Sequence, residues 1–186
     1  GVPAFKIASG EISNLPLLEY TAEKGKPMIV STGASTIGEI EEAVSTIKAT
    51  GNENIILLHC VSNYPAAIED TNLRCITTMQ RVFQLPIGYS DHTLGIAAPI
   101  VAVALGAVVI EKHFTLNKKL PGPDHFYALE PQELKAMVEN IRTIEKLMGS
   151  PTKQPTKAEL ESRKLGRRSI FAIRNIPTGT TITREM

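Results

Sequence analysis

Two histidines stand at the ends of successive apolar runs in this sequence, a position from which they could share a metal ion. His92 follows the run at 87–89, and His113 lies near the end of the run at 108–114. If the two runs are adjacent parallel strands, their backbones lie about 5 Å apart, and two imidazoles can then bind one Mn-, Fe- or Zn-like ion. The alternative is a pair of hydrogen-bonded histidines at the edge of the core. The matched strand ends favour the metal, because a metal site needs ligands that converge.

Two acidic residues near these histidines are the candidate catalytic groups. Glu111 precedes His113 by two positions, so both side chains share one face of the strand. Its carboxylate could orient a ligand or bind a metal-bound water, or it could be a barrel-filling acid. Asp124 lies in a loop at 120–125 that is stiffened by two prolines. Such a loop can hold Asp124 over a site with little loss of entropy, although a plain surface loop would have the same composition.

A lysine and several small polar residues indicate an anionic substrate. Lys6 lies inside the apolar run at 5–8, where a lysine is uncommon without a partner; the alternative is a lysine that points outward to the helices. Small polar residues stand at the ends of the runs: Ser9, Ser31, Asn63 and Ser90. A cation supplies charge and small donors supply geometry for a phosphate or carboxylate. Several such groups around one mouth therefore predict that an anion binds there.

The elements that must position these groups alternate between two kinds. Short apolar runs are separated by stretches whose apolar residues recur at helical spacing, and one such stretch opens with a capping box of Thr36 and Glu39. The runs lie at 5–8, 28–30, 55–60, 87–89 and 108–114. Strands that alternate with helices predict an α/β fold with a parallel sheet, either doubly wound or a closed barrel. Polar residues at the end of every run favour a barrel, which gathers chemistry at one mouth, over a doubly wound sheet with one switch point.

Composition places the chain among ordinary globular proteins. Of its 186 residues, 42% are hydrophobic and 21% are charged, and the formal net charge is +1. This charge indicates neither nucleic-acid nor membrane-surface binding, and no apolar run reaches the roughly 18 residues that cross a bilayer. We expect the two cysteines, Cys60 and Cys75, to be buried free thiols in a reducing compartment, the cytoplasm.

The pattern changes after Gly149, which predicts three parts. Residues 1–149 carry the β/α units and form a partial barrel if the sheet is of the barrel type. Residues 150–167 are predicted to be a linker rich in Pro, Thr and Lys, with a charged helical stretch at 157–166. Residues 168–186 look like the start of a small second domain, with a strand at 169–173 and a turn at 177–179 before another strand.

Six segments together resemble the sialic acid synthase family. They are FKIASGE at 5–11, STG at 31–33, HCVSNYP at 59–65, GYSDHT at 88–93, IEKHFT at 110–115 and PGPDH at 121–125. The likeness runs in order through essentially the whole chain. It implies a (β/α)8 TIM barrel, of which residues 1–149 would be the last five units. A small antifreeze-like (SAF) β domain would follow and would begin at residue 168.

The resemblance also implies an activity and roles for single residues. The family condenses phosphoenolpyruvate with an N-acetyl-hexosamine such as N-acetylmannosamine, releases phosphate and makes a nine-carbon 2-keto acid. His92 and His113 match the ligands of its divalent metal, usually Mn, with Mg or Co as alternatives. The phosphoenolpyruvate-binding positions match Lys6, Ser9, Ser31, Asn63 and Ser90, and the sugar-binding positions match Glu11, Tyr64 and Asp124. A homodimer is expected for the full-length protein.

The chain departs from the family pattern in what it covers. Five strands are visible where the barrel needs eight, so we expect strands one to three to be missing. With them would go the family's strand-one glutamate, thought to be an acid/base, and a further phosphate-binding lysine. An open half-barrel exposes two sheet edges, and we expect the 186-residue chain to be inactive by itself.

Three alternatives stay open. The amino sugar could be that of a sister synthase for legionaminic acid, pseudaminic acid or spore-coat polysaccharide. The barrel could belong to another metal-dependent enzyme, such as a hydrolase or a sugar isomerase, in which Glu111 or Asp91 is a third ligand. It could also be a carbohydrate-binding barrel that has lost activity.

Overall fold

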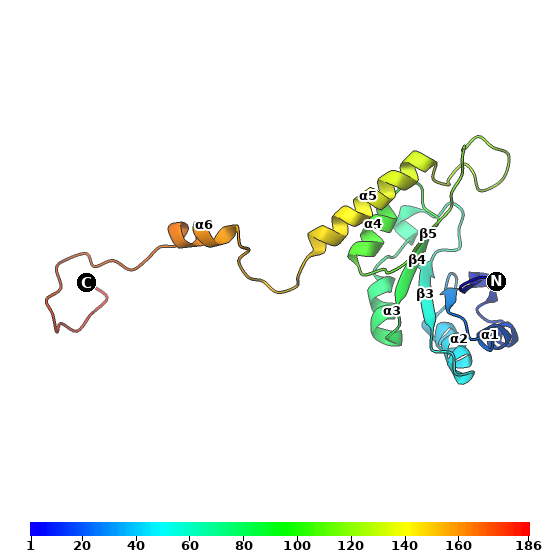
Figure 1. Cartoon of the computed structure of the whole chain (residues 1–186), viewed down its shortest axis with the longest axis horizontal. Coiled ribbons are helices and arrows are strands. Elements are labelled where there is room, and N and C mark those ends of the chain that lie inside the picture. The colour runs from blue at the N-terminus through cyan, green and yellow to red at the C-terminus, as the bar shows by residue number, and fades with distance from the viewer. The chain divides into compact units, whose positions relative to one another are not determined.

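The computed structural model describes all 186 residues and divides them into two compact units, Gly1–Gly149 and Ser150–Met186. The first unit holds five strands: β1 (Phe5–Ile7), β2 (Met28–Ser31), β3 (Ile55–Cys60), β4 (Ile87–Asp91) and β5 (Ile110–Lys112). Its α-helices are α1 (Leu15–Ala22), α2 (Ile37–Ala49), α3 (Cys75–Phe83), α4 (Ala97–Ala104) and α5 (Pro131–Met148). Two short 3-10 helices, η1 (Ser9–Glu11) and η2 (Ile68–Asp70), follow the ends of β1 and β3. Figure 1 shows β3, β4 and β5 side by side with α3, α4 and α5 on one side of them.

Local sequence signals explain where the helices begin. At α2 the predicted capping box forms: the Thr36 backbone N–H donates to the Glu39 carboxylate at 2.7 Å, and the Glu39 N–H donates to the Thr36 hydroxyl at 3.4 Å. The bonds that the Thr36 N–H and the Thr36 hydroxyl donate to the Glu39 carboxylate lower the pKa of this carboxyl. At α5 a proline occupies the first turn, where its missing N–H costs nothing, and the helix ends at Gly149 with φ +50°.

The five strands form one curved parallel sheet. Their order is β1-β2-β3-β4-β5, with every neighbouring pair parallel. A doubly wound sheet reverses its strand order at a switch point, and this sheet has no reversal. In a flat sheet β1 and β5 would lie about 19 Å apart, at about 4.8 Å per strand. The Lys6 ammonium on β1 is nevertheless 3.6 Å from the Glu111 carboxylate on β5, so the sheet curls into an arc of a barrel, and the barrel prediction is confirmed for this five-stranded half.

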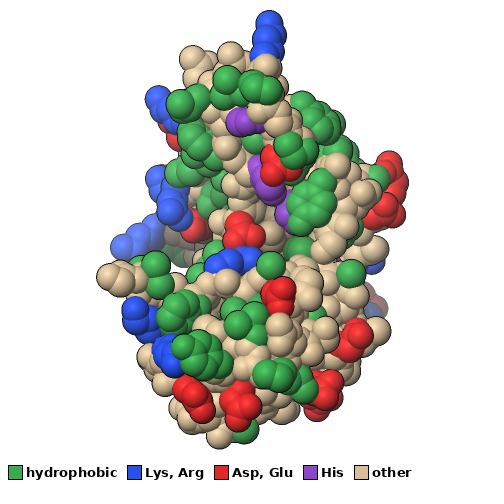
Figure 2. Space-filling view, turned by 90° about the vertical axis from the view of Figure 1, so that its right-hand side faces the viewer, with side chains coloured by type: hydrophobic (Ala, Val, Ile, Leu, Met, Phe, Trp, Pro, Cys, Tyr) green, Lys and Arg blue, Asp and Glu red, His purple; other side chains and the backbone are tan.

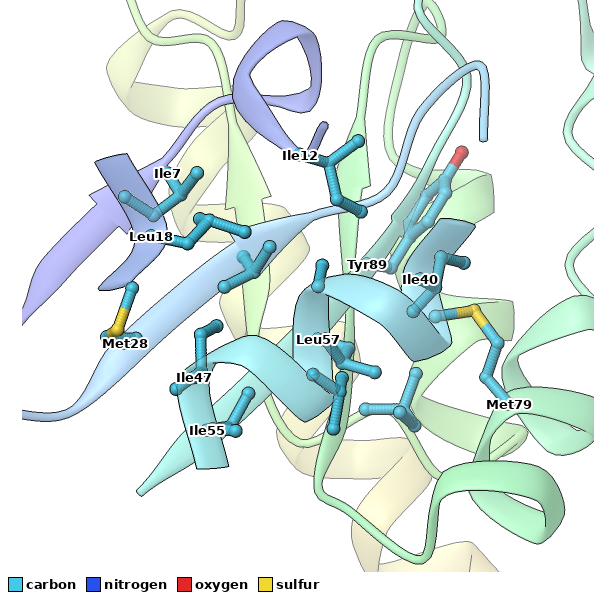
Figure 3. Packing of buried hydrophobic residues seen from close by; sticks show 14 of the residues in the cluster. Ile7, Ile12, Leu18, Met28, Ile40, Ile47, Ile55, Leu57, Met79 and Tyr89 are labelled. Carbon is cyan, nitrogen blue, oxygen red and sulfur yellow. The ribbon is translucent and has the colours of Figure 1, made fainter. Parts of the chain in front are cut away.

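The main hydrophobic core lies between the outer face of the sheet and the helices. Every second strand side chain points to the helices, and Ile7, Met28, Leu57 and Tyr89 pack there with Leu18 of α1 (Figure 3). Burying each such side chain stabilises the fold by about 1.5–3 kcal/mol. A smaller cluster between α4 and α5 contains the buried residues Leu129, Met137 and Ile141.

The inner face of the arc carries the alternate side chains. Lys6, Ser90 and Glu111 lie on it together with apolar residues such as Leu58, which is fully buried. The helices therefore use one face of each strand, and the polar candidate residues occupy the other. The fold thus separates the residues that stabilise the sheet from those predicted to bind ligands.

The second unit differs from its prediction. It contains a helix, α6 (Glu159–Gly166), within the charged stretch expected to be helical, and a turn in which the Thr180 N–H donates to the Pro177 carbonyl. The strands expected in 168–186 do not form, so that part of the prediction is wrong. Ile170 and Phe171 are 102% and 79% exposed. A strand needs both a paired neighbour and a face to bury, and here neither residue has such a face; the assignment of an SAF domain stays a prediction.

Two further expectations can be compared with the structure. Both cysteines are free thiols, but only Cys60 is buried; Cys75, the first residue of α3, is exposed, so its predicted burial is wrong. No helix in the structure combines the length and apolar character that a membrane span requires.

We predict that Gly88→Ala destabilises the half-barrel. A methyl group on Gly88 would lie 2.6 Å from the Val109 carbonyl oxygen and 2.5 Å from the Leu58 side chain, and such overpacking costs about 1–3 kcal/mol. Gly38→Ala is the matched control, because a methyl group at this helical position meets no neighbour and should raise stability by about 0.5–1 kcal/mol. Urea denaturation measures both free energies of unfolding. Equal effects of the two substitutions would contradict the close approach of β4 and β5.

Candidate active site

The two histidines lie together at the carboxyl ends of β4 and β5. Their ring centroids are 5.4 Å apart at an interplanar angle of 67°. His92 Nδ1 lies 2.7 Å from the Val61 carbonyl oxygen. A carbonyl can only accept, so Nδ1 carries the proton and Nε2 keeps its lone pair free. Figure 2 shows histidines gathered with acidic and hydrophobic side chains on one face of the molecule.

The surroundings of His92 favour its neutral form. Burial is the largest cause that lowers the pKa of His92, and the nearby His113 lowers it further, against the opposing effect of the hydrogen bond to Val61. A metal binds the neutral imidazole, not the protonated ring. The environment of His92 therefore suits a ligand role near neutral pH.

Two tyrosines enclose the histidine pair. The Tyr64 ring lies 4.1 Å from the His92 ring, centroid to centroid, in the segment after β3, where the Tyr64–Pro65 peptide bond is cis. The Tyr127 ring lies 5.0 Å from the His113 ring. Tyr64 is about half exposed, whereas Tyr127 is buried. The histidines therefore have one aromatic neighbour that is half exposed and one that is buried.

The loop between β5 and α5 brings Asp124 to His113. One carboxylate oxygen of Asp124 accepts a hydrogen bond from the Tyr127 hydroxyl at 2.7 Å, and the other lies 3.8 Å from His113 Nδ1. A second anchor joins the loop to its base, because His125 Nδ1 lies 2.7 Å from the Thr115 hydroxyl. Asp124 is thus held beside the histidine pair by contacts as well as by the stiffness of the loop.

Glu111 joins the histidines to the predicted anion-binding residues. The Ser90 hydroxyl donates to one Glu111 carboxylate oxygen at 2.7 Å, and the Lys6 ammonium lies 3.6 Å from the same oxygen. Lys6 therefore points across the inner face and not toward the helices. The three side chains form one polar group, and Glu111 shares its face of the strand with His113.

Ser31 and Ser9 lie in two different environments. The Ser31 hydroxyl is buried without a hydrogen-bond partner, and such a group costs about 1–3 kcal/mol unless a ligand or water satisfies it. The Ser9 hydroxyl accepts from the Gly33 N–H at 2.9 Å and lies 3.3 Å from the Cys60 sulfur. A methyl group on Gly33 would collide with both of these atoms, so only glycine permits this close approach.

Two predicted binding residues make only local contacts. Glu11, in η1, accepts from the Asn14 side chain at 2.8 Å. Asn63 is exposed and accepts from the Tyr64 backbone N–H at 3.1 Å. The structure records no contact of either residue with the histidines or with Lys6, so their binding roles stay predictions.

The structure excludes Asp91 as a third metal ligand. Its carboxylate is fully buried on the outer face of the sheet, 2.6 Å from the Lys112 ammonium, and it also accepts from the Tyr89 hydroxyl at 3.1 Å. The strand continues through Asp91, so Asp91 and His92 point to opposite faces. This network and Tyr127 are the features that sequence reasoning missed.

The donor set fits a metal that takes few protein ligands. No group of three or more His, Cys, Asp or Glu side chains is arranged to hold an ion. His92 offers a free Nε2, and His113 stands beside it. Two imidazoles suit a divalent ion whose other positions are filled by oxygen atoms of water or substrate.

A sequence model of the NeuB family matches residues 1–153. The chain belongs to the NeuB family. An uncharacterized Methanocaldococcus jannaschii protein, MJ1065, is 57% identical over 178 residues, which cover 96% of this chain and 53% of that protein. The N,N'-diacetyllegionaminic acid synthase of Legionella pneumophila is 49% identical and covers 100% of this chain. The mouse N-acetylneuraminate-9-phosphate synthase is 46% identical over 100% of this chain.

Solved structures agree with this membership. The N-acetylneuraminic acid synthetase of Leptospira borgpetersenii superposes with a TM-score of 0.83 at 43% identity, covering 90% of this chain and 60% of that chain. A 3-deoxy-D-arabino-heptulosonate 7-phosphate synthase of Thermotoga maritima, at 21% identity and a TM-score of 0.70, shares the fold. This NeuB-family chain spans about half the length of the curated relatives it matches, 53% of the Legionella synthase and 52% of the mouse enzyme.

We predict that Lys112→Met strongly destabilises the NeuB-family half-barrel. The substitution leaves the Asp91 charge buried without its cation, which costs about 3–5 kcal/mol. Lys135→Met is the control, because the Lys135–Glu139 pair is exposed and such pairs contribute at most about 1 kcal/mol. Urea denaturation at neutral pH gives both values. Adding Asp91→Asn to Lys112→Met should recover part of the loss; no recovery would show that charge burial is not the cause.

Proposed function

We propose that this chain is the metal- and phosphoenolpyruvate-binding half of a sialic-type acid synthase. The reaction condenses phosphoenolpyruvate with N-acetylmannosamine or a related N-acetyl-hexosamine and yields phosphate and a nine-carbon 2-keto acid. The observation that carries the proposal is the position of Glu111. Its carboxylate accepts a hydrogen bond from Ser90 and lies close to Lys6, and the histidine pair follows on the same face of the sheet. Relatives named as legionaminic, pseudaminic and N-acetylneuraminate-9-phosphate synthases support it.

His92 and His113 would hold the divalent ion, most simply Mn, with Mg or Co as alternatives. When bound, such an ion supplies Lewis acidity toward the aldehyde oxygen of the sugar. Lys6 and Ser90 hold the phosphoryl group and so keep the enol carbon in line with the aldehyde carbon, an effect of orientation. Ser9, Ser31 and Asn63 add neutral donors, and the unpartnered Ser31 hydroxyl gains a partner when the anion binds.

The carboxylates then serve the steps that follow attack. The enol carbon forms a bond to the aldehyde carbon as the aldehyde C=O π bond opens to an alkoxide, which takes up a proton from solvent, and the phosphate-bearing carbon becomes cationic. Glu111 accepts a proton from the water that adds to this carbon. The bond between this carbon and the phosphate oxygen then breaks, phosphate leaves, and the new hydroxyl loses its proton to become the keto group. Asp124, with Tyr64 and Glu11, positions the hydroxyl groups of the sugar. Asp124 is suited to this because its side chain is 58% exposed beside His113.

A second candidate function differs from the first only in the amino sugar that is condensed with phosphoenolpyruvate. The Legionella legionaminic acid synthase is 49% identical, which favours a sister synthase of that branch as the second candidate. We further propose a cytoplasmic protein that works as a homodimer in its full-length form.

We predict that this chain binds Mn²⁺ through the two histidines. His92→Ala and His113→Ala should each weaken binding by more than about 100-fold, beyond the range typical for loss of an outer-sphere partner. His125→Gln is the control, since His125 contacts the loop residue Thr115. Electron paramagnetic resonance of free Mn²⁺ measures the affinity. Unchanged binding in both alanine variants would contradict the proposed metal site.

We predict that catalysis needs this chain joined to the rest of a NeuB-family barrel. The chain alone, with Mn²⁺, phosphoenolpyruvate and N-acetylmannosamine, should release no phosphate, because Lys6 and Glu111 are 35% and 43% exposed on the open inner face. A chimera in which this chain replaces the matching region of the Legionella synthase should release phosphate. Lys6→Met should lower the rate of the chimera by at least about 10-fold, as expected for the loss of a charged hydrogen bond.

The chimera also separates an enzyme from a carbohydrate-binding barrel. A folded chimera that binds Mn²⁺ and phosphoenolpyruvate but releases no phosphate with any amino sugar of the branch would contradict the proposed activity. Phosphate release by the chain alone at the rate of the full-length synthase would contradict the need for the remaining strands.

A further inference from the structure

We propose that Tyr127 is a positioning residue of this site. It determines which ring nitrogen of His113 carries the proton, and it occupies one carboxylate oxygen of Asp124 so that the other oxygen is available to the sugar. The role of His113 as a ligand rests on the proposed function, whereas the position of its proton does not. Tyr127 comes from the loop that leads into α5, a segment that the sequence alone does not connect with the histidines.

The backbone around Tyr127 is tied to the end of β5. The Leu129 N–H donates to the His113 carbonyl at 2.9 Å, and the Thr115 N–H donates to the Leu129 carbonyl at 2.9 Å. Tyr127, two residues earlier, is 2% exposed, and its ring lies 5.0 Å from the His113 ring. The phenol therefore has little freedom to move away from the histidine.

The available protons determine the direction of each contact. A phenol has one proton, and a carboxylate can only accept, so the 2.7 Å bond between the Tyr127 hydroxyl and Asp124 uses that proton. The Tyr127 oxygen can then only accept from His113 Nδ1, which lies 3.5 Å away, and the second Asp124 oxygen at 3.8 Å can also only accept. His113 Nδ1 can thus form a hydrogen bond here only when it carries the proton, which favours the tautomer whose Nε2 has a free lone pair.

The phenol remains a donor over a wide range of pH. Burial, as the largest cause, and the contact with Asp124 both raise the pKa of Tyr127 above its ordinary value. The phenol therefore keeps its proton well above neutral pH.

Both histidines thus carry their proton on Nδ1, but different groups hold it there. His92 is set by the Val61 backbone carbonyl, which no side-chain substitution removes. His113 is set by the side chains of Tyr127 and Asp124. An outer partner that orients a ligating imidazole in this way sets which nitrogen can bind the metal. One Asp124 oxygen is occupied by Tyr127, so the other is left for a sugar hydroxyl.

The test is the proton position on the imidazole rings of the metal-free chain at slightly alkaline pH, read from proton–nitrogen correlation spectra of the histidines. The intact chain should show His113 in the Nδ1–H form. Tyr127→Phe, which keeps the ring and removes one oxygen, should convert His113 to a mixture of both tautomers. Tyr20→Phe is the control: it also removes one phenolic oxygen, but from an exposed tyrosine of α1, and it should leave His113 unchanged.

Two results would overturn the proposal. One is an Nε2–H form of His113 in the intact chain, which needs no variant and so does not depend on whether Tyr127→Phe folds. The other is an unchanged His113 in folded Tyr127→Phe. If Mn²⁺ binds as proposed, Tyr127→Phe should also weaken it by about 10-fold. If neither the intact chain nor any variant binds Mn²⁺, the proposed metal site is wrong. The spectra would still test the role of Tyr127.

Discussion

A buried ion pair holds the ends of β4 and β5 together, and the positions of both histidines follow from it. The Asp91 carboxylate and the Lys112 ammonium are 2.6 Å apart, with side-chain exposures of 0% and 3%. The two residues are also partners in the strand register. Each precedes a histidine by one position, so the ion pair sets the relative height of His92 and His113 from the opposite face of the sheet.

Such a pair is stable only when its remaining polar groups are satisfied, because both charges lose their hydration. Besides Lys112, the Asp91 carboxylate accepts from the Tyr89 hydroxyl and from the Thr93 backbone N–H at 2.8 Å. Lys112 also donates to the Thr93 carbonyl. Both backbone groups of Thr93 are therefore fixed, and with them the turn that follows His92. An apolar pair at these positions could fill the space but would leave this turn without its anchors.

The sequence contains the signals that act over short range, and these predict most of the fold. The capping box of Thr36 and Glu39 and the alternation within strands depend on neighbouring residues alone. The same alternation separates Asp91 from His92 once the strand is known to extend two residues beyond its apolar run. Tyr127 could not be foreseen, since its place beside His113 depends on how the loop before α5 folds. The strands expected within 168–186 depend on partners in space, which no local pattern contains.

Glu111 shows how the inner face can be ordered before a substrate arrives. It accepts from Ser90 and lies near Lys6, the two residues that the proposed function assigns to the phosphoryl group. The Lys6–Glu111 pair is more than one-third exposed, and exposed ion pairs contribute only about 0–1 kcal/mol. Glu111 therefore keeps Lys6 aligned across the arc at little cost to an incoming anion. A buried pair, such as that of Asp91 and Lys112, would hold its lysine too firmly for that purpose, and the fold places it behind the sheet, where it fixes the strands instead.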